Sequence, residues 1–264
     1  GGVVALLQSY FPSATTRQIR QSIINSAFYN EKLADKCQAQ GTLNAYGAMI
    51  DLEKTLMSQK YSIDESKVIT DGEYYILNAD TGSFLSFDKA LAGTDSRANL
   101  TTKCGDAQKF KIEITKNLEY VIMPVDGKDD CFYYNEERSH AYIGDFGETG
   151  NHAWKIEYAG KAGNDDIYHL NSYKDTDATN SLYEISGLLN VMPKGSTSYK
   201  TANKNWIFVP ASKINEYTPV YSDRMDPHWF AENDDNVNPN LPANQIPDES
   251  IYEGEYYIQN VVTG

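Results

Sequence analysis

Apolar residues recur along the chain with two different periods, and the change falls near residue 70. Before it, apolar positions are three or four residues apart, which predicts short helices over residues 3–11, 15–27 and 44–52. After it, short runs rich in Tyr, Ile and Val alternate with turn residues, which predicts β-strands. The pattern therefore indicates a helical segment followed by a mainly β domain.

The second predicted helix has both a start signal and an apolar stripe. Thr15 is followed three residues later by Gln18, which is the spacing of a capping box. Ile19, Ile23 and Ala27 lie on one face of the helix. Three short helices bury little surface among themselves, so we expect this stripe to lack a partner and the helices to be loosely held.

The strands fall into three approximate copies of one unit between residues 71 and 210. Each copy opens on a strand rich in Tyr or Ile and closes on a strand that contains a large aromatic residue. The openings are 74–77, 120–123 and 167–170, and the closings are 108–112, 152–156 and 204–208. Successive closing aromatics are 44 and 52 residues apart, which leaves room for about four strands in each copy. An internal repeat of this kind predicts threefold closure of one domain.

The closing strands carry the sequences Q-x-F, H-x-W and K-x-W, which end at Phe110, Trp154 and Trp206. This pattern resembles the ricin-type β-trefoil, in which each unit ends in Q-x-W, and the resemblance covers residues 71–210. It implies a mainly β fold, a β-trefoil preceded by the short helical segment. We expect the three rings to fill the centre of the barrel, because large aromatic side chains bury the most apolar area.

The ricin-type resemblance implies carbohydrate binding, and the sequence keeps only part of the usual site. Sugar recognition needs an aromatic face, a carboxylate and an amide. In the family the carboxylate follows a leucine of the second strand, and here those positions hold Ser86, Tyr133 and Tyr183. Asp106 and Gln108 are the best remaining polar pair, and we assign them as the candidate carbohydrate-binding residues. Both can instead hold the turn before the closing strand.

The helical segment carries a second resemblance. The sequences GGVVALLQSYFPSATTRQIRQSIINSA and GTLNAYGAM, within residues 1–52, resemble the C-terminal end of a subtilisin-like serine peptidase domain, an α/β fold. The family motif G-T-S-M-A-x-P-x-V-x-G would then end at Gly2, with the whole Ser-His-Asp triad upstream. The resemblance therefore implies no catalytic residue in this chain, and a peptide substrate only for a full-length parent protein.

Other catalytic or metal chemistry has little support in the sequence. The four histidines are His140, His152, His169 and His228. None of them belongs to a motif for nucleophilic or zinc chemistry. Acidic stretches at 126–130 and 175–180 lack the closing glutamate of a calcium loop, and we interpret them as solvated turns. We predict no metal site and no cofactor.

Charge and composition narrow the partners further. A net charge of −14 argues against a nucleic-acid partner, which requires a basic surface. No apolar run approaches the roughly 20 residues that a membrane span needs. The three cysteines, Cys37, Cys104 and Cys131, are too few for a disulfide framework and do not decide whether Cys104 pairs with Cys131. Together with the family resemblance, the composition suggests a secreted or cell-surface protein.

Two segments are predicted as linkers, one over residues 53–70 and an acidic one, rich in Pro and Asn, over 211–250. Residues 253–264 repeat residues 71–82 with eight of twelve positions identical. We therefore expect residues 251–264 to be the first strand of a second trefoil, and the chain to be a fragment of a longer protein.

Two functions remain open at this point. The first is a fragment of a secreted subtilisin-like endopeptidase whose trefoil targets it to a glycan or a protein. The second is a non-catalytic carbohydrate-binding or adhesion module. The incomplete sugar site is also consistent with a trefoil that binds protein.

Overall fold

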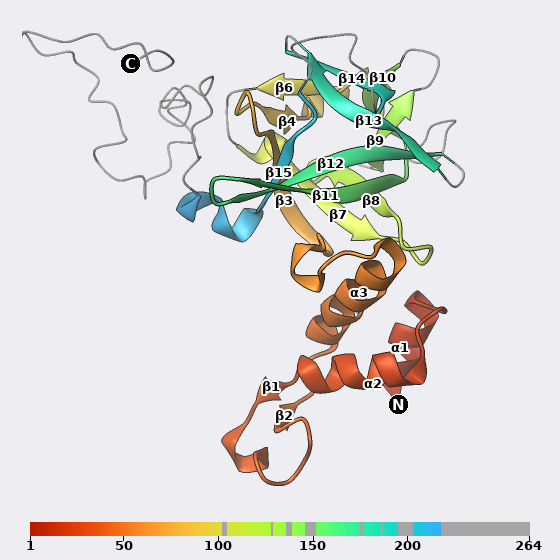
Figure 1. Ribbon diagram of the computed structural model, residues 1–264, viewed down its shortest axis with the longest axis vertical. Helices are drawn as coiled ribbons and strands as arrows, with labels where there is room; N and C mark the ends of the chain where they lie inside the picture. The colour runs from red at the N-terminus through yellow and green to blue at the C-terminus, as the bar shows by residue number, and fades with distance from the viewer. Residues whose placement is uncertain are drawn as a thin grey trace, which may run out of the picture. The chain divides into compact units, whose positions relative to one another are not determined.

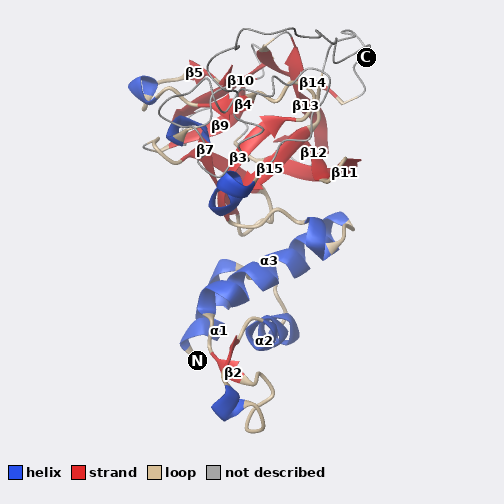
Figure 2. Ribbon diagram, turned by 90° about the vertical axis from the view of Figure 1, so that its left-hand side faces the viewer, coloured by secondary structure: helices blue, strands red, loops and turns tan. Residues whose placement is uncertain are grey.

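The computed structural model describes residues 1–101, 105–127, 129–135, 139–145, 152–174, 177–185, 187–194 and 203–217. Contacts divide the chain into two units. The first consists of residues 1–71 together with 112–121, and the second of residues 72–111 together with the chain from residue 122 onward. The first is mostly helical and the second mostly β (Figures 1 and 2).

The helical unit contains three α-helices and a two-stranded hairpin. Its elements are α1 (Gly2–Tyr10), α2 (Thr16–Asn25), β1 (Phe28–Tyr29), η1 (Glu31–Leu33), β2 (Gly41–Thr42), α3 (Ala45–Tyr61) and η2 (Glu65–Lys67). Strands β1 and β2 pair antiparallel. No helix among the described residues is long and apolar enough to cross a membrane.

Side-chain caps begin α2 and α3 where the sequence predicts. The Gln18 amide N–H donates to the Thr15 hydroxyl at 3.3 Å, and the Thr15 amide N–H donates to the Gln18 side-chain oxygen at 2.7 Å, so the capping box is confirmed. Asn44 accepts a hydrogen bond from the Gly47 amide at 2.9 Å and caps α3.

The third helix is longer than predicted. It continues to Tyr61, so residues 53–61, predicted as part of a linker, are helical. The mixed charges of this stretch hide its helical period, but Glu, Lys, Leu, Met and Gln are all strong helix formers. The helix stops where Ser62 adopts a left-handed conformation, with φ of 55°.

The prediction of an unpartnered apolar stripe is wrong for Ile19, whereas Ile23 and Ala27 are only half-buried. Ile19 is only 1% exposed, because α2 lies against α3. The extra turns of α3 supply Leu56 and Met57, both buried, which the predicted shorter helix lacked. Large apolar side chains are exposed elsewhere in this unit, namely at Val4, Leu6, Tyr10, Phe28, Tyr29, Leu43 and Tyr46.

A buried carboxyl group lies within the helical unit. Glu53 on α3 is fully buried, and one of its oxygens accepts the Asp71 amide N–H at 3.1 Å. The Asp71 carboxylate accepts the Ile114 amide N–H at 2.6 Å. Burial first, and the Asp71 charge second, raise the pKa of Glu53 to about 9. Glu53 is therefore protonated at neutral pH.

The described part of the β unit contains thirteen strands, of which twelve follow the predicted threefold plan with four in each copy, and β5 is an additional short strand. The strands are β3 (Gly72–Asn78), β4 (Phe84–Ser86), the short β5 (Ser96–Arg97), β6 (Asn99–Thr101), β7 (Lys109–Ile114), β8 (Tyr120–Pro124), β9 (Asp130–Asn135), β10 (His140–Asp145), β11 (Trp154–Ala162), β12 (Asp165–Lys174), β13 (Asp177–Ile185), β14 (Leu188–Pro193) and β15 (Trp206–Pro210). Three 3₁₀ helices accompany them, η3 (Lys89–Leu91), η4 (Asp106–Gln108) and η5 (Ala211–Glu216).

The first and last strands of the three copies close a ring. Strands β3, β7, β8, β11, β12 and β15 pair in this order, and β15 returns to β3. The middle strands of each copy form the hairpins β4–β6, β9–β10 and β13–β14. In Figure 1 these hairpins lie above the ring strands β3, β11, β12 and β15. A closed six-stranded barrel with three hairpins is the β-trefoil arrangement, so the chain is mainly β with N-terminal helices.

Three closing aromatics fill the interior as predicted. Phe110, Trp154 and Trp206 are each 0% exposed. The Trp154 indole N–H donates to the Phe132 carbonyl at 2.8 Å, and the Trp206 indole N–H donates to the Leu182 carbonyl at 3.1 Å. Each tryptophan thus ties the last strand of its copy to the second strand. Phe110 has no N–H group, so the first copy lacks this bond.

Some predictions fall outside the described residues. The acidic linker over 211–250 is described only as far as residue 217, where η5 occupies its start, and residues 251–264 are not described. Cys104 also lies outside, so its pairing stays open. Cys131 is buried and Cys37 is exposed.

We predict that the two functions of Trp154 can be separated by substitution. Trp154→Phe keeps an aromatic ring but leaves the Phe132 carbonyl without its donor, which should cost about 1–3 kcal/mol of unfolding free energy. Trp154→Ala also leaves a cavity and should cost about 3–5 kcal/mol. Denaturant unfolding measures both. A cost below about 1 kcal/mol for the alanine variant would show that the ring contributes little to the core.

We predict that Glu53 makes the helical unit less stable as pH rises. Its folded-state pKa of about 9 exceeds the ordinary glutamate value of 4.5, so its stabilising effect is complete below the lower value and is lost as pH rises through the upper one. Glu53→Gln stays neutral and should flatten the pH dependence of thermal unfolding followed by circular dichroism. Glu31→Gln, at an exposed position, is the control. An unchanged pH profile in Glu53→Gln would contradict the buried protonated carboxyl.

Candidate functional site

The two predicted carbohydrate-binding residues lie on the short helix η4 but have different surroundings. Gln108 is buried, and its side-chain amide donates to the Ser86 hydroxyl at 2.8 Å. The Asp106 carboxylate is exposed and pairs with the Lys109 ammonium at 3.2 Å. Gln108 therefore ties η4 to β4, which is the structural alternative considered from the sequence. Sugar binding by this pair stays a prediction.

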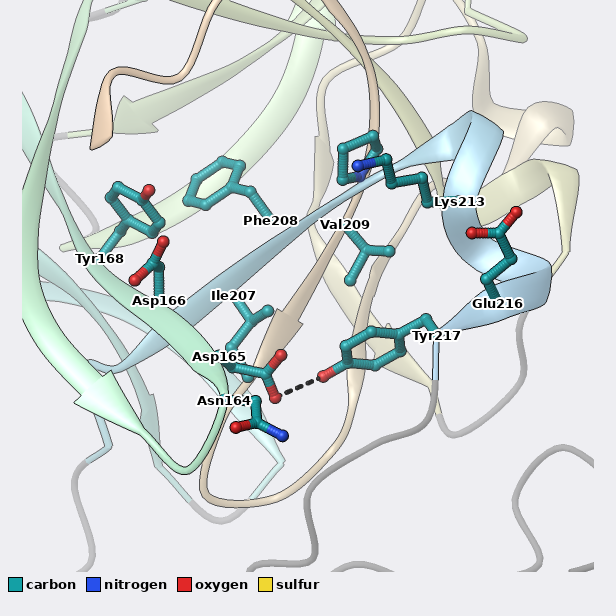
Figure 3. Close-up of a pocket in the computed structure, with 11 residues that line it drawn as sticks. Asn164, Asp165, Asp166, Tyr168, Ile207, Phe208, Val209, Lys213, Glu216 and Tyr217 are labelled. Atoms are coloured by element: carbon teal, nitrogen blue, oxygen red, sulfur yellow. Dashed lines mark hydrogen bonds between the residues drawn. The ribbon is translucent and has the colours of Figure 1, made fainter. Parts of the chain in front are cut away.

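A pocket that the sequence did not predict lies beside β12, β15 and η5 (Figure 3). It encloses about 430 Å³, within the range of small-molecule sites. The turn between β11 and β12 supplies Asn164, and the start of β12 supplies Asp165, Asp166 and Tyr168. The remaining lining residues are Ile207, Phe208, Val209, Pro210, Lys213, Glu216 and Tyr217.

One hydrogen bond joins the two sides of this pocket. The Tyr217 hydroxyl donates to one Asp165 carboxylate oxygen at 3.0 Å, drawn as a dashed line in Figure 3. No other hydrogen bond of the Asp165 carboxylate is found among the described residues, so its second oxygen can accept one from a ligand. The pocket therefore offers an acceptor beside a half-buried tyrosine ring.

Burial dominates the electrostatics of the pocket. Desolvation raises the pKa of Asp165, the Tyr217 hydrogen bond opposes this shift, and the charge of Asp166 adds to it. Burial and the Asp165 carboxylate together raise the pKa of Tyr217, which keeps its hydroxyl protonated and able to donate. The Asp166 carboxylate lies 3.9 Å from the Lys161 ammonium.

The floor of the pocket consists of packed aromatic rings. Tyr168 and Phe208 meet edge to face, with ring centroids 5.5 Å apart, and Tyr74 packs on Phe208 at 6.3 Å. All three are nearly fully buried. Of the aromatic residues that line the pocket, Tyr217 is the one that keeps exposed surface.

Sequence reasoning did not find this pocket. Its residues come from two segments, 164–168 and 207–217, that are separated by a whole hairpin. The one local signal for it is the polar run Asn164-Asp165-Asp166. Nothing in the sequence shows that Tyr217 lies opposite that turn.

The acidic turn at residues 126–130 is stabilised by contacts within the protein. Both oxygens of buried Asp130 accept the Gly93 amide N–H, at 3.1 and 3.0 Å, and the Asp126 carboxylate lies 3.7 Å from the Lys89 ammonium. The second stretch, 175–180, lies partly outside the described residues. Within the described part of the chain, no group of three or more His, Cys, Asp or Glu residues is arranged to hold a metal ion.

Comparison with known proteins finds resemblance in structure alone. No protein-family model and no curated protein sequence matches the chain. A GlcNAcα1-4Gal-releasing endo-β-galactosidase from Clostridium perfringens is 16% identical with a TM-score of 0.40, over 53% of this chain and 32% of that one. SeviL, bound to asialo-GM1 saccharide, is 19% identical with a TM-score of 0.41, over 54% and 99%. The Rhizoctonia solani agglutinin is 18% identical with a TM-score of 0.42, over 54% and 97%.

These likenesses cover about half of this chain, and the match spans about a third of the galactosidase. At this level of similarity they assign no ligand to this chain. The assignment of the β-trefoil fold rests on the closed ring of strands described above. None of them supports the resemblance of residues 1–52 to a subtilisin-like peptidase.

We predict that Tyr217→Phe raises the pKa of Asp165 further, because the lost hydroxyl no longer stabilises the carboxylate. The pH titration of the Asp165 carboxyl carbon by NMR measures this shift. Tyr183→Phe, on β13, removes a hydroxyl that does not contact Asp165 and should leave the titration unchanged. A downward shift in Tyr217→Phe would contradict the hydrogen bond.

Proposed function

We propose that the trefoil is a non-catalytic glycan-binding module and that its site is the pocket formed by β12, β15 and η5. One observation carries the proposal. The half-buried Asp165 carboxylate lies beside the exposed part of the Tyr217 ring in a pocket of about 430 Å³.

The polar groups of the pocket suit sugar hydroxyls. A hydroxyl both donates and accepts, so a sugar needs acceptors and donors side by side. Asp165 supplies an acceptor, and the exposed Asn164 amide supplies both kinds of group. A hydrogen bond to a charged partner contributes about 1.5–3 kcal/mol, so Asp165 is expected to dominate affinity.

The tyrosine ring suits the other face of a sugar. One face of a pyranose presents C–H groups, which pack on an aromatic ring, and Tyr217 combines such a ring with a polar end. The bond from Tyr217 to Asp165 fixes both side chains before a ligand arrives. This preorganisation reduces the entropy lost on binding.

A second proposal concerns residues 1–52, which we propose belong to a subtilisin-like peptidase domain. The exposure of Leu6, Phe28, Tyr29 and Leu43 favours it, because a larger domain would cover such side chains. Reading the coding sequence upstream of Gly1 tests it. The motif G-T-S-M-A-x-P in that position would support a peptidase parent, and its absence would contradict this second proposal.

We predict that glycan binding depends on Asp165. A glycan array probed with the whole chain identifies ligands, and calorimetry measures the affinity of variants. Asp165→Ala should weaken binding by about tenfold or more, because it removes a charged acceptor. Tyr217→Phe keeps the ring and should weaken binding less.

Asp106→Ala is the matched control, since it removes an exposed carboxylate from the site predicted by sequence. Loss of binding in Asp106→Ala but not in Asp165→Ala would move the site to the first copy of the repeat. No binding of any glycan by the wild-type chain would contradict the proposed function and favour a protein ligand.

A further inference from the structure

A second pocket lies on the outer face of β11, β12 and β13. It encloses about 370 Å³ and is lined by Glu157, Tyr158, Ala159, His169, Ser181, Lys194 and Lys204. It shares none of its lining residues with the pocket that contains Asp165. Its lining contains two lysines and one glutamate, whereas the whole chain has a net charge of −14.

Strand register explains why polar groups gather here. Glu157 on β11 lies directly opposite His169 on β12, and Asn171 on β12 lies opposite Ser181 on β13. Alternate residues of a strand point to the same face, so these four side chains share one side of the sheet. On the same strands, Ile156, Leu170 and Leu182 are buried.

The single carboxylate of the pocket is already fully engaged. Glu157 accepts hydrogen bonds from the Lys194 ammonium at 2.7 Å and from the Asn171 amide at 2.8 Å, and the Lys155 ammonium lies 3.8 Å from its other oxygen. Burial opposes its ionisation, but the Lys194 hydrogen bond and the Lys155 charge outweigh that effect and lower the pKa of Glu157. Glu157 therefore stays ionised and cannot neutralise a further cation.

Lys204 is the cation that remains. Its ammonium donates to the Lys194 carbonyl at 3.2 Å and lies 5.9 Å from the centre of the Tyr183 ring. Within the described part of the chain, no carboxylate forms an ion pair with it. These contacts hold the ammonium at the pocket while its charge is uncompensated, because a carbonyl and a ring face accept a cation without cancelling it.

The positive charge of Lys204 affects the pKa of the neighbouring His169. Burial first, and the Lys204 charge second, lower the pKa of His169, whose ring nitrogen lies 3.3 Å from the Asn205 side-chain oxygen. The lining thus contains two lysines against one glutamate, with a neutral histidine between them at pH 7. The net local charge is positive.

We propose that this pocket binds a small oxyanion group, held mainly by the Lys204 ammonium, with the Lys194 ammonium as a second donor that stays paired with Glu157. The shared chemistry is a compact anion with several acceptor oxygens, which a sugar carboxylate or a sulfate group both provide. The volume is enough for a single acidic sugar residue rather than a longer chain. The inference does not depend on the glycan site at Asp165, because the two pockets use different residues.

NMR titration of the whole chain at low ionic strength tests the proposal, with the His169 ring protons as the reporter. The probes are sodium sulfate and glucuronate, with glucose as the uncharged control. We expect saturable shifts with either anion and none with glucose. A response to both anions shows that charge suffices, whereas a response to glucuronate alone assigns the carboxylate sugar as the ligand.

Three variants make the result specific. Lys204→Gln should weaken anion binding by about tenfold, because one charged hydrogen bond is lost. Glu157→Gln frees Lys194 and should strengthen binding by about fivefold. Lys213→Gln, an exposed lysine of the Asp165 pocket, should change nothing.

Equal affinity in Lys204→Gln and the wild type would overturn the proposal, as would equal shifts with glucose and glucuronate. Failure of the anion titration does not affect the test of the glycan site, because that test compares the affinities of Asp165 variants and the two pockets share no lining residue.

Discussion

The structure of the β unit depends on the closure of one ring of six strands. An open sheet exposes unpaired N–H and C=O groups at both edges, and closure removes those edges. Here the last strand, β15, pairs with both β12 and β3, so the two ends of the domain meet at Trp206 and Asn78. Closure also places β12 beside β15, and both strands line the pocket that contains Asp165.

The interior of the ring is held by three aromatics that are equivalent in position but not in chemistry. Trp154 and Trp206 each donate an indole N–H to a carbonyl of the second strand, whereas Phe110 cannot. In the first copy a different contact joins the corresponding elements, the hydrogen bond from Gln108 to Ser86. Gln108, which the sequence suggested as part of a sugar site, thus stabilises the fold instead. A role inferred from a motif therefore has to be checked against the contacts that the residue makes.

Both proposed sites arise where the threefold plan is broken. The Asp165 pocket exists because η5 follows the last strand and brings Tyr217 against the turn before β12. The oxyanion pocket exists because Lys194 and Lys204, on either side of the segment before β15, cover a polar face of the third copy. The repeat provides the scaffold, and the strands and turns of its second and third copies, together with η5, provide the chemistry.

The sequence by itself determined the local features of this protein. The capping box at Thr15, the start of α3 at Asn44, the six opening and closing strands and the burial of Phe110, Trp154 and Trp206 all follow from period, cap and repeat, because each depends on residues close in the chain. Local signals failed at α3, where mixed charges hid nine further helical residues.

Only the tertiary structure decided which distant residues meet. The pairing of Asp165 with Tyr217, of Glu157 with Lys194, and the burial of Glu53 beside Asp71 join residues 18 to 52 positions apart. No period or motif encodes such distances. In the β unit they are set by strand register and ring closure, and in the helical unit by the position of α3 beside the segment that contains Asp71, so the sites form only in the complete fold.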